Sequence, residues 1–295
     1  MAPFNYSLNP SFDSQFSENN QTSSETIFDV PHYWAGWGSG NAFYYFGGQE
    51  LWGGSTTHSG RNMEYGWNDW ANVVVSNASV QAFTYPDESG ANYTDPRAAL
   101  TFYGDAASGG DTDFCQNCSA STVDPLPDYA KDENGNKLAS GPFRFLFQTN
   151  GYRTRKYNNY EVREKEEIPS SNINSQVIRY ADVLLMLAEA LIEQGKVDEA
   201  LPLINQVRAR VEAFQYGSLG SQDNARTILR RERRLELWGE QSRYFDLIRW
   251  GIAKEVINAE KQAPIFQDRH ILFPIPQAEK DANPNVATDI SSGWN

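Results

Sequence analysis

Aromatic rings, carboxamides and glycines crowd into the sequence between residues 32 and 70. The stretch HYWAGWGSGNAFYYF (residues 32–46) carries many rings without the period of a helix or a strand. Rings in a loop of this kind have little reason to serve core packing, and aromatic side chains make effective binding surfaces. We therefore expect this region to bind a ligand.

Carboxylates among these rings raise one catalytic alternative. Glu50, Glu64 and Asp69 lie in the same region, and two carboxylates on either side of a glycosidic bond are enough for its hydrolysis. The surrounding sequence has no barrel or other hydrolase framework, so a glycoside hydrolase is the weaker alternative. No nucleophile elbow, zinc-protease motif or phosphate-binding loop occurs, and the three histidines lie far apart. We predict no catalytic residue and no enzymatic activity.

Metal binding has one candidate, the acidic stretch GDAASGGDTDF. Asp105, Asp111 and Asp113 offer the carboxylate oxygens that Ca²⁺ prefers, but a solvated acidic turn explains them more simply. Cys115 and Cys118 form a CxxC that lacks the strand and helix of a redox site and cannot by itself close a tetrahedral zinc site. A disulfide and two free thiols both stay open for them. We expect no metal site and no cofactor, with calcium as the one alternative.

The charge balance excludes one class of partner. The formal net charge of −13 repels nucleic acid, because phosphate binding depends on an excess of Lys and Arg. The arginines of residues 230–251 alternate with Glu232, Glu236, Glu240 and Asp246 at helical spacing, which indicates ion pairs rather than a basic patch. No apolar run approaches the ~18 residues of a membrane-spanning helix, so we expect the chain itself to be soluble.

The composition and the periodicity of the sequence change near residue 170. Residues 1–170 are rich in Gly, Asn, Ser and aromatic residues, which predicts a loop-rich ligand-binding region with short β-hairpins. Residues 171–295 contain the helical periodicity and predict a helical scaffold. We expect the two parts to form one compact unit.

Two helices of the second part form the clearest predicted motif. Residues 177–195 (VIRYADVLLMLAEALIEQG) are apolar on nearly every face, as in a helix buried between neighbours, and Gly195 suits its C-terminal cap. The next helix is predicted to begin at Asp198 as its N-cap. Its apolar positions follow three-and-four spacing: Leu201, Ile204, Val207 and Val211. Together the two resemble one tetratricopeptide unit, which normally stacks on others of its kind. Further helices are predicted over residues 224–238 and up to Trp250.

Six segments, read in order, resemble the SusD/RagB family over residues 23–295. They are SSETIFDV (23–30), TDPRAALTFYGD (94–105), RKY (155–157), IRYADVLLMLAEAL (178–191), RRERRLELWGEQSRYFDLIRWG (230–251) and LFPIPQAEKDANPNV (272–286). The resemblance implies a mainly α-helical fold, with tetratricopeptide-like helix pairs as a scaffold and an irregular, loop-rich face that holds the ligand. It also implies an outer-membrane lipoprotein, exposed at the cell surface, that binds glycans without cleaving them and passes them to a TonB-dependent, SusC-like transporter.

The sequence departs from the family pattern at its start. It shows no signal peptide, no lipid-bearing cysteine near the N-terminus and none of the N-terminal helical repeats, so we expect it to be the C-terminal portion of such a protein. Attachment to the membrane would then need a lipid anchor that this chain lacks. The single helical unit over residues 177–211 is expected to leave apolar surface for other units or another copy to cover.

The resemblance also points to ligand-binding residues, because the family holds its ligand with aromatic rings that precede the DPR segment. A pyranose has a flat C–H face that packs on such a ring, while its hydroxyls need amide and carboxylate partners. The candidates for ligand contact are Trp34, Trp37, Tyr45, Trp52, Asn62, Tyr65, Trp67, Asn68, Asp69 and Trp70. The preferred rings are Trp34, Trp37, Trp52 and Trp67, and about half of the rings in the region are expected to pack structurally.

Motif residues of the helical part are expected to be structural. Their charges would form internal ion pairs that hold the helices in register. They are Tyr180, Glu189, Arg234, Glu236, Trp238, Phe245, Asp246 and Trp250.

A peptide or protein-derived nutrient is the alternative ligand, since helical repeats commonly bind peptides. The aromatic loops favour a glycan, because a peptide site more often shows an extended apolar groove or an exposed strand edge. The sequence leaves the glycan, its linkage, its length and the oligomeric state open.

Overall fold

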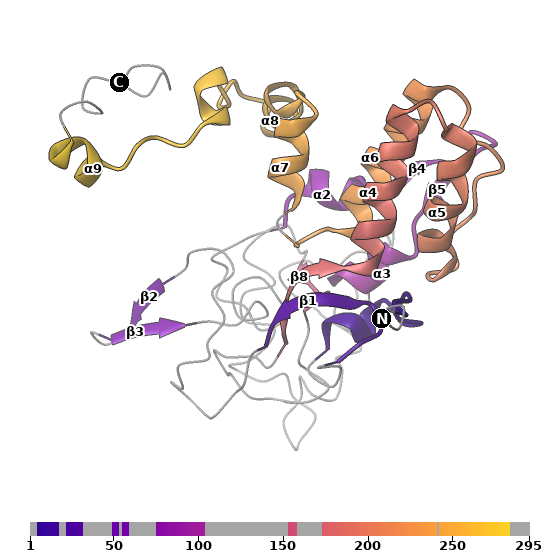
Figure 1. Cartoon of the computed structure of the whole chain (residues 1–295), viewed down its shortest axis with the longest axis horizontal. Helices are drawn as coiled ribbons and strands as arrows, with labels where there is room; N and C mark the ends of the chain where they lie inside the picture. Colours follow the sequence, from indigo (N-terminus) through magenta and orange to yellow (C-terminus); the bar gives the residue numbers. More distant parts are fainter. Residues whose placement is uncertain are drawn as a thin grey trace, which may run out of the picture. The chain divides into compact units, whose positions relative to one another are not determined.

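The computed structural model describes residues 5–17, 22–31, 49–52, 55–58, 75–103, 153–157, 173–240 and 242–283. Contacts divide the chain into two compact units, Met1–Trp238 and Gly239–Asn295. Helices dominate the described residues and the strands are short (Figure 1), as expected for a mainly α fold. The boundary expected near residue 170 stays a prediction.

Three helices make the scaffold of the first unit. They are α4 (Tyr180–Glu193), α5 (Val197–Ala209) and α6 (Gln222–Glu236), and α4 contacts both of the others. Gly195 lies in the turn after α4 with a φ of 75°, a left-handed conformation that glycine adopts without steric cost. The predicted helical hairpin and its glycine cap are therefore confirmed.

The predicted starts of two helices need correction. Residues 177–179 do not begin α4 but belong to strand β8 (Ser175–Arg179), which pairs antiparallel with β1 (Thr26–Val30). The adjacent β-branched residues in this stretch suit a strand once a partner strand is present. Asp198 is not the N-cap of α5, since Lys196 holds that position and Asp198 lies in the first turn. There its negative charge still favours the helix, because a helix N-terminus carries partial positive charge.

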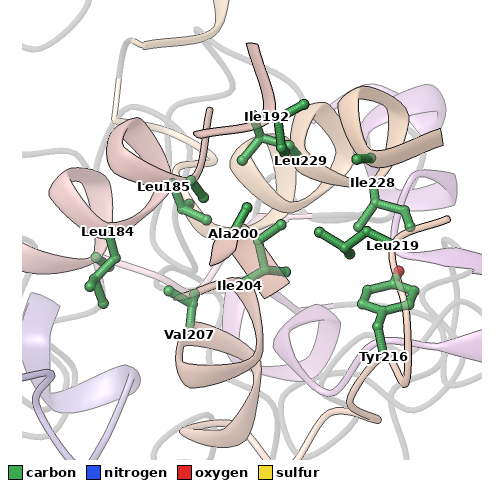
Figure 2. Packing of buried hydrophobic residues seen from close by; sticks show 13 residues of the cluster. Leu184, Leu185, Ile192, Ala200, Ile204, Val207, Tyr216, Leu219, Ile228 and Leu229 are labelled. Carbon is green, nitrogen blue, oxygen red and sulfur yellow. The ribbon is translucent and has the colours of Figure 1, made fainter. Parts of the chain in front are cut away.

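The core of the scaffold is one cluster of mainly aliphatic side chains, with the ring of Tyr216, between and beside the three helices (Figure 2). On each helix the buried residues recur every three or four positions, so that one face is apolar. The cluster residues on the three helices are Ala181, Leu184, Leu185, Ala188, Ile192, Ala200, Ile204, Val207, Ala225, Ile228 and Leu229. Burial of these side chains supplies the main driving force for docking the helices together.

The opposite face of α4 is apolar as well, but exposed. Met186 is 45% exposed and Leu187 is 49% exposed, and Val183 and Ala190 continue the same stripe at helical spacing. Helices of repeat proteins carry two apolar faces because each packs on a neighbour on both sides. The expectation that the single helical unit leaves apolar surface is therefore confirmed on α4.

The described strands form antiparallel two-stranded ribbons. Besides β1–β8 they are β2 (Gln49–Trp52) with β3 (Ser55–His58), β4 (Thr84–Pro86) with β5 (Asn92–Thr94), and β6 (Phe102–Tyr103) with β7 (Arg153–Thr154). The short helical elements of this part of the unit are η1 (Asp13–Phe16), α2 (Asn77–Gln81) and α3 (Arg97–Thr101). The β1–β8 and β6–β7 ribbons join stretches that lie far apart in the sequence.

Two smaller apolar clusters bind these elements to the scaffold. The first contains Phe12, Phe16, Tyr157, Ile173, Val211 and Ala213. The second contains Val75, Val80, Phe83, Tyr85, Ala98, Phe102 and Leu235. Edge-to-face ring pairs occur in both, with centroid distances of 5.2 Å for Phe16–Tyr157 and 5.1 Å for Phe83–Phe102. Such pairs add directional packing to area burial.

The second unit has its own small core. Its elements are α7 (Ser242–Arg249), α8 (Ala253–Lys261), η5 (Asp268–Ile271) and α9 (Gln277–Ala282). Leu247, Ala253 and Phe266 are buried together, and the Tyr244 hydroxyl donates to the backbone oxygen of His270 at 2.6 Å. Phe245 is 60% exposed, but its ring meets that of Tyr244 edge-to-face with centroids 5.6 Å apart; its expected structural role stays a prediction.

Replacing a core leucine tests which face of α4 is buried. Leu185→Ala should lower the free energy of unfolding by about 2–5 kcal/mol, because it removes buried area and leaves a cavity. The matched control Leu187→Ala, two residues along on the exposed face, should cost less than about 1 kcal/mol. Chemical denaturation of the two variants measures both values. Equal losses would contradict the exposure of the second face.

Candidate functional site

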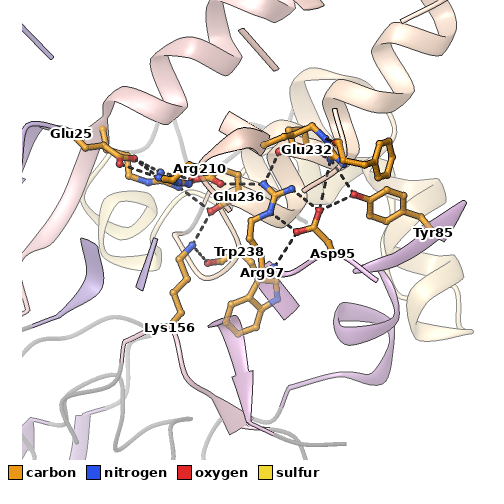
Figure 3. A network of polar contacts seen from close by, with 12 residues as sticks. Glu25, Tyr85, Asp95, Arg97, Lys156, Arg210, Glu232, Glu236 and Trp238 are labelled. Carbon is orange, nitrogen blue, oxygen red and sulfur yellow. Dashed lines mark hydrogen bonds and ion pairs between the residues drawn. The ribbon is translucent and has the colours of Figure 1, made fainter. Parts of the chain in front are cut away.

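The most elaborate group of polar side chains in the first unit surrounds Glu236, the last residue of α6 (Figure 3). Its carboxylate accepts hydrogen bonds from Arg179 Nη1 at 2.7 Å and Arg97 Nη1 at 3.1 Å, and a short one from Arg210. Its backbone oxygen accepts from Arg179 Nη2 and from Lys156 Nζ, both at 2.9 Å. One residue of α6 therefore receives bonds from four separate stretches of chain.

A second carboxylate of α6 lies one turn earlier. Glu232 accepts from Arg97 Nη1 at 2.6 Å and from Arg208 Nη1 at 2.8 Å. Asp95 accepts from Arg97 Nε and Nη2, both at 2.8 Å, and from the Tyr85 hydroxyl at 2.8 Å. Because Glu232 and Glu236 are four residues apart, they project from the same face of α6 and share Arg97.

Glu25 closes the other end of this network. It accepts from Arg179 Nη1 at 2.7 Å, from Arg210 Nη1 at 3.0 Å and from the backbone N–H of Asn9 at 2.8 Å. In Figure 3 its carboxylate faces Arg210, on the opposite side of Glu236 from Asp95. We call the set of Glu25, Asp95, Arg97, Arg179, Arg208, Arg210, Glu232 and Glu236 the buried ion network.

Lys156 contacts the network from the described stretch of residues 153–157. Its Nζ donates to the backbone oxygens of Glu236 at 2.9 Å and Trp238 at 2.8 Å. It also lies 4.4 Å from the centre of the Phe16 ring and 5.1 Å from that of Phe12. The carbonyls and the faces of the rings help to stabilise this buried ammonium.

Burial and the neighbouring arginines have opposite effects on the pKa values of Glu236 and Asp95, and the arginines have the larger net effect. Burial alone would raise the pKa of Glu236, but Arg210, Arg179 and Arg97 hold that pKa well below its usual value. Burial likewise opposes ionisation of Asp95, and Arg97 keeps its pKa lowered. Burial and the charge of Asp95 raise the pKa of the Tyr85 hydroxyl. Glu236 and Asp95 are thus ionised and the Tyr85 phenol is neutral at neutral pH.

This arrangement suits support rather than catalysis. Members of the buried ion network are almost fully excluded from solvent, with side-chain exposures of 0–2%. Two guanidinium nitrogens, Arg208 Nη2 and Arg210 Nε, have no hydrogen-bond partner within the described residues. Their guanidinium groups lie against aromatic rings instead, Arg208 at 4.3 Å from Phe214 and Arg210 at 5.0 Å from Phe12.

The same unit holds the ends of three long segments that lie outside the described residues. Residues 104–152 begin and end at the β6–β7 ribbon, where Tyr103 is paired with Arg153. Residues 158–172 begin after Tyr157 and end before Ile173, which are buried in one cluster. Residues 59–74 end at Val75, buried in another. Bringing the two ends of a chain segment together costs entropy, which the pairing and burial of these end residues offset.

The expected ligand-binding residues lie almost wholly outside the described part. Trp52 is the exception, and only through its backbone, which ends β2 opposite Ser55. The residues outside the description are Trp34, Trp37, Tyr45, Asn62, Tyr65, Trp67, Asn68, Asp69 and Trp70. The calcium candidates Asp105, Asp111 and Asp113 and the two cysteines also lie outside it. Their assignments stay predictions.

The motif residues expected to be structural have clear outcomes. Glu236 forms the ion pairs predicted for it, although with arginines of other segments rather than along its own helix. Asp246 pairs with Arg249 within α7 at 2.8 Å. Arg234 donates to the backbone oxygen of Ala78 at 3.2 Å, and Trp238 packs on Phe102 at 4.8 Å.

Several residues in or beside the buried ion network are not identified by local sequence patterns. Glu25, Asp95, Arg97 and Lys156 occur in the segments SSETIFDV, TDPRAALTFYGD and RKY, but their partners lie elsewhere in the chain. The sequence feature that could have indicated their burial is a charged residue next to apolar residues in a short motif. Arg208 and Arg210, at the end of α5, gave no separate signal.

The described residues contain no group of three or more His, Cys, Asp or Glu side chains placed to hold a metal ion. Among them, too, no helix has the length and apolar character needed to cross a bilayer.

Comparisons with known proteins agree on one family. A sequence model of the SusD family matches residues 48–294. The SusD-like protein P38 of Formosa agariphila is 32% identical over 151 residues, which are 48% of this chain and 29% of that protein. The chain therefore aligns with well under half of that relative.

Solved structures resemble the chain over nearly its whole length. A SusD-like carbohydrate-binding protein from Bacteroides fragilis aligns with a TM-score of 0.62 at 23% identity, covering 96% of this chain and 58% of that one. A laminarin-binding SusD-like protein aligns with a TM-score of 0.55 at 25% identity, covering 93% of this chain and 52% of that one. This chain thus spans little more than half the length of either structure, and its helical fold is theirs.

The central carboxylate can be tested by removing its charge. Glu236→Gln should lower the free energy of unfolding by about 3–5 kcal/mol at neutral pH, because it leaves buried arginines without their counter-charge. The matched control Glu199→Gln removes a carboxylate that is 63% exposed and faces Lys196 at 4.0 Å, and it should cost less than about 1 kcal/mol. Urea denaturation measures both. A loss below about 1 kcal/mol for Glu236→Gln would contradict the role of the network.

The lowered pKa values predict the response to acid. Glu236 and Asp95 contribute stability that is complete above the pKa of the unfolded chain and is lost as the pH falls through their folded values. The free energy of unfolding should therefore decrease below about pH 5. The slope should be shallower for Glu236→Gln than for the wild type, as followed by denaturation at a series of pH values. Identical slopes would mean that Glu236 does not contribute.

Proposed function

The chain belongs to the SusD family, and from this premise we propose that it binds an oligo- or polysaccharide at the cell surface for delivery to a TonB-dependent outer-membrane transporter. In this proposal the protein binds the glycan and does not cleave it. The observation that carries the proposal is the family match over residues 48–294. The laminarin-binding relative supports a glycan as the ligand class, since 93% of this chain aligns with it.

The ligand contacts in this proposal come from residues 32–70, which we call the aromatic segment. Trp34, Trp37, Trp52 and Trp67 would pack on the C–H faces of sugar rings. Amides and carboxylates of the same segment, such as Asn62, Asn68 and Asp69, would pair with the hydroxyls. The charged groups of the buried ion network are engaged in internal pairs, which suits a structural role and leaves ligand binding to other residues. The network lies in the same unit as Val75, where residues 59–74 end.

The transporter partner and the surface location rest on family membership. That this chain itself contacts the transporter is also a proposal, because the chain spans little more than half the length of the two solved relatives. The acidic net charge of −13 favours neutral or cationic ligands over anionic ones, which makes a neutral glycan the first choice among substrates.

Calorimetry against soluble polysaccharides, with product analysis after long incubation, tests this function. Laminarin is the first probe, followed by xylan, galactomannan and starch. Binding of one glycan class without new reducing ends is the expected outcome. Release of shorter products would contradict a purely binding role and favour the carboxylates Glu50, Glu64 and Asp69. Binding of peptides alone would replace the glycan as the ligand.

Two ring substitutions test the location of the site. Trp37→Ala and Trp67→Ala should each lower the affinity for the glycan about 10-fold or more, since each removes a ring on which a sugar stacks. The matched control is Phe273→Ala, which removes a ring that is 75% exposed in the second unit and lies outside the aromatic segment. Unchanged affinity in both tryptophan variants, with the fold intact by circular dichroism, would contradict the assignment.

A further inference from the structure

A shallow hollow lies on the first unit, where α5 and the loop after it meet. Its volume is about 380 Å³, and it is lined by Leu201, Pro202, Asn205, Gln206, Ala209 and Gln215. All but Gln215 recur at helical spacing on α5, so they form one stripe about 12 Å long, given a rise of about 1.5 Å per residue. The stripe lies away from the buried residues Ile204 and Val207, and Pro202, Gln206 and Ala209 in it are exposed.

The hollow is held in shape by bonds between its two walls. Asn205 Oδ1 accepts from the backbone N–H of Tyr216 at 2.9 Å, and Asn205 Nδ2 donates to the backbone oxygen of Tyr216 at 2.9 Å. Arg208 Nε donates to the backbone oxygen of Phe214 at 2.6 Å. Both neighbours of Gln215 are thus tied to α5. A site whose walls are already fixed loses less entropy when a ligand binds.

The side chains that line the hollow are uncharged, and they are partly aliphatic and partly carboxamides. Leu201, Pro202 and Ala209 provide aliphatic surface, and no charged side chain lines the hollow. Gln206 and Gln215 are exposed, and neither side-chain amide has a hydrogen-bond partner in the described part of the chain. A carboxamide both donates and accepts hydrogen bonds, as a sugar hydroxyl does.

We propose that this hollow is a second, weaker binding site for a neutral saccharide. The C–H face of one or two sugar units would lie on Leu201, Pro202 and Ala209, with the hydroxyls bonded to Gln206 and Gln215. The volume is near the lower end of the range of about 300–1,000 Å³ for ligand pockets. A charged ligand would find no counter-charge here. A second contact of this kind strengthens the hold on a long polymer by raising its effective concentration.

This inference rests on the proposed function, but its residues do not overlap with the aromatic segment. Nitrogen-15 spectra of the full chain give separate signals for the side-chain amides of Gln206 and Gln215, identified by their loss in Gln206→Ala and Gln215→Ala. The probes are laminarihexaose, cellohexaose, xylohexaose and mannohexaose. With at least one probe, both amides should shift saturably. Gln194, an exposed glutamine that does not line the hollow, provides the internal control and should not shift.

The outcomes separate this site from the aromatic one. Shifts that persist in Trp37→Ala/Trp67→Ala and disappear when Ala209→Arg fills the hollow would support the proposal. A hexasaccharide that binds by calorimetry without moving either amide would overturn the second site and leave the proposed function intact. Equal shifts with an uncharged hexapeptide would contradict the saccharide class. Failure of every sugar to bind, by either method, would overturn both.

Discussion

Glu236 is fully buried at the end of α6, and a carboxylate in such a place is tolerated only where positive charge surrounds it. The charge comes from Arg97 at the start of α3, Arg179 at the end of β8 and Arg210 just after α5. Each arginine can reach the carboxylate only when its own segment is docked. The electrostatic requirement of one side chain therefore couples the helical scaffold to the strands and short helices around it.

The helical hairpin could be predicted from sequence because its determinants are local. Apolar spacing along α4 and α5 and the glycine between them need no knowledge of the rest of the chain. The strand over residues 177–179 could not be predicted in the same way, since it exists through its pairing with β1, about 150 residues earlier in the chain. Local propensity is a weak guide wherever a distant partner decides the conformation.

The charged residues of α6 show the same limit. Their spacing predicts ion pairs along the helix, and the structural role expected for Glu236 is confirmed. Yet Glu232 and Glu236 bond to Arg97, which is more than 130 residues away, and no single-sequence pattern identifies such a partner. The aromatic ligand residues rest on resemblance and composition, and all except the backbone of Trp52 lie outside the described residues. The neutral hollow on α5 gave no sequence signal, because exposed glutamines are common on helices.

The β6–β7 ribbon joins two short strands that lie about 50 residues apart in the sequence. Tyr103 and Arg153, which flank residues 104–152, are neighbours in this ribbon. The entropic cost of bringing two ends of a chain together grows only with the logarithm of the number of residues between them. Closure of the ribbon therefore depends strongly on the pairing of its two strands and only weakly on how many residues separate them.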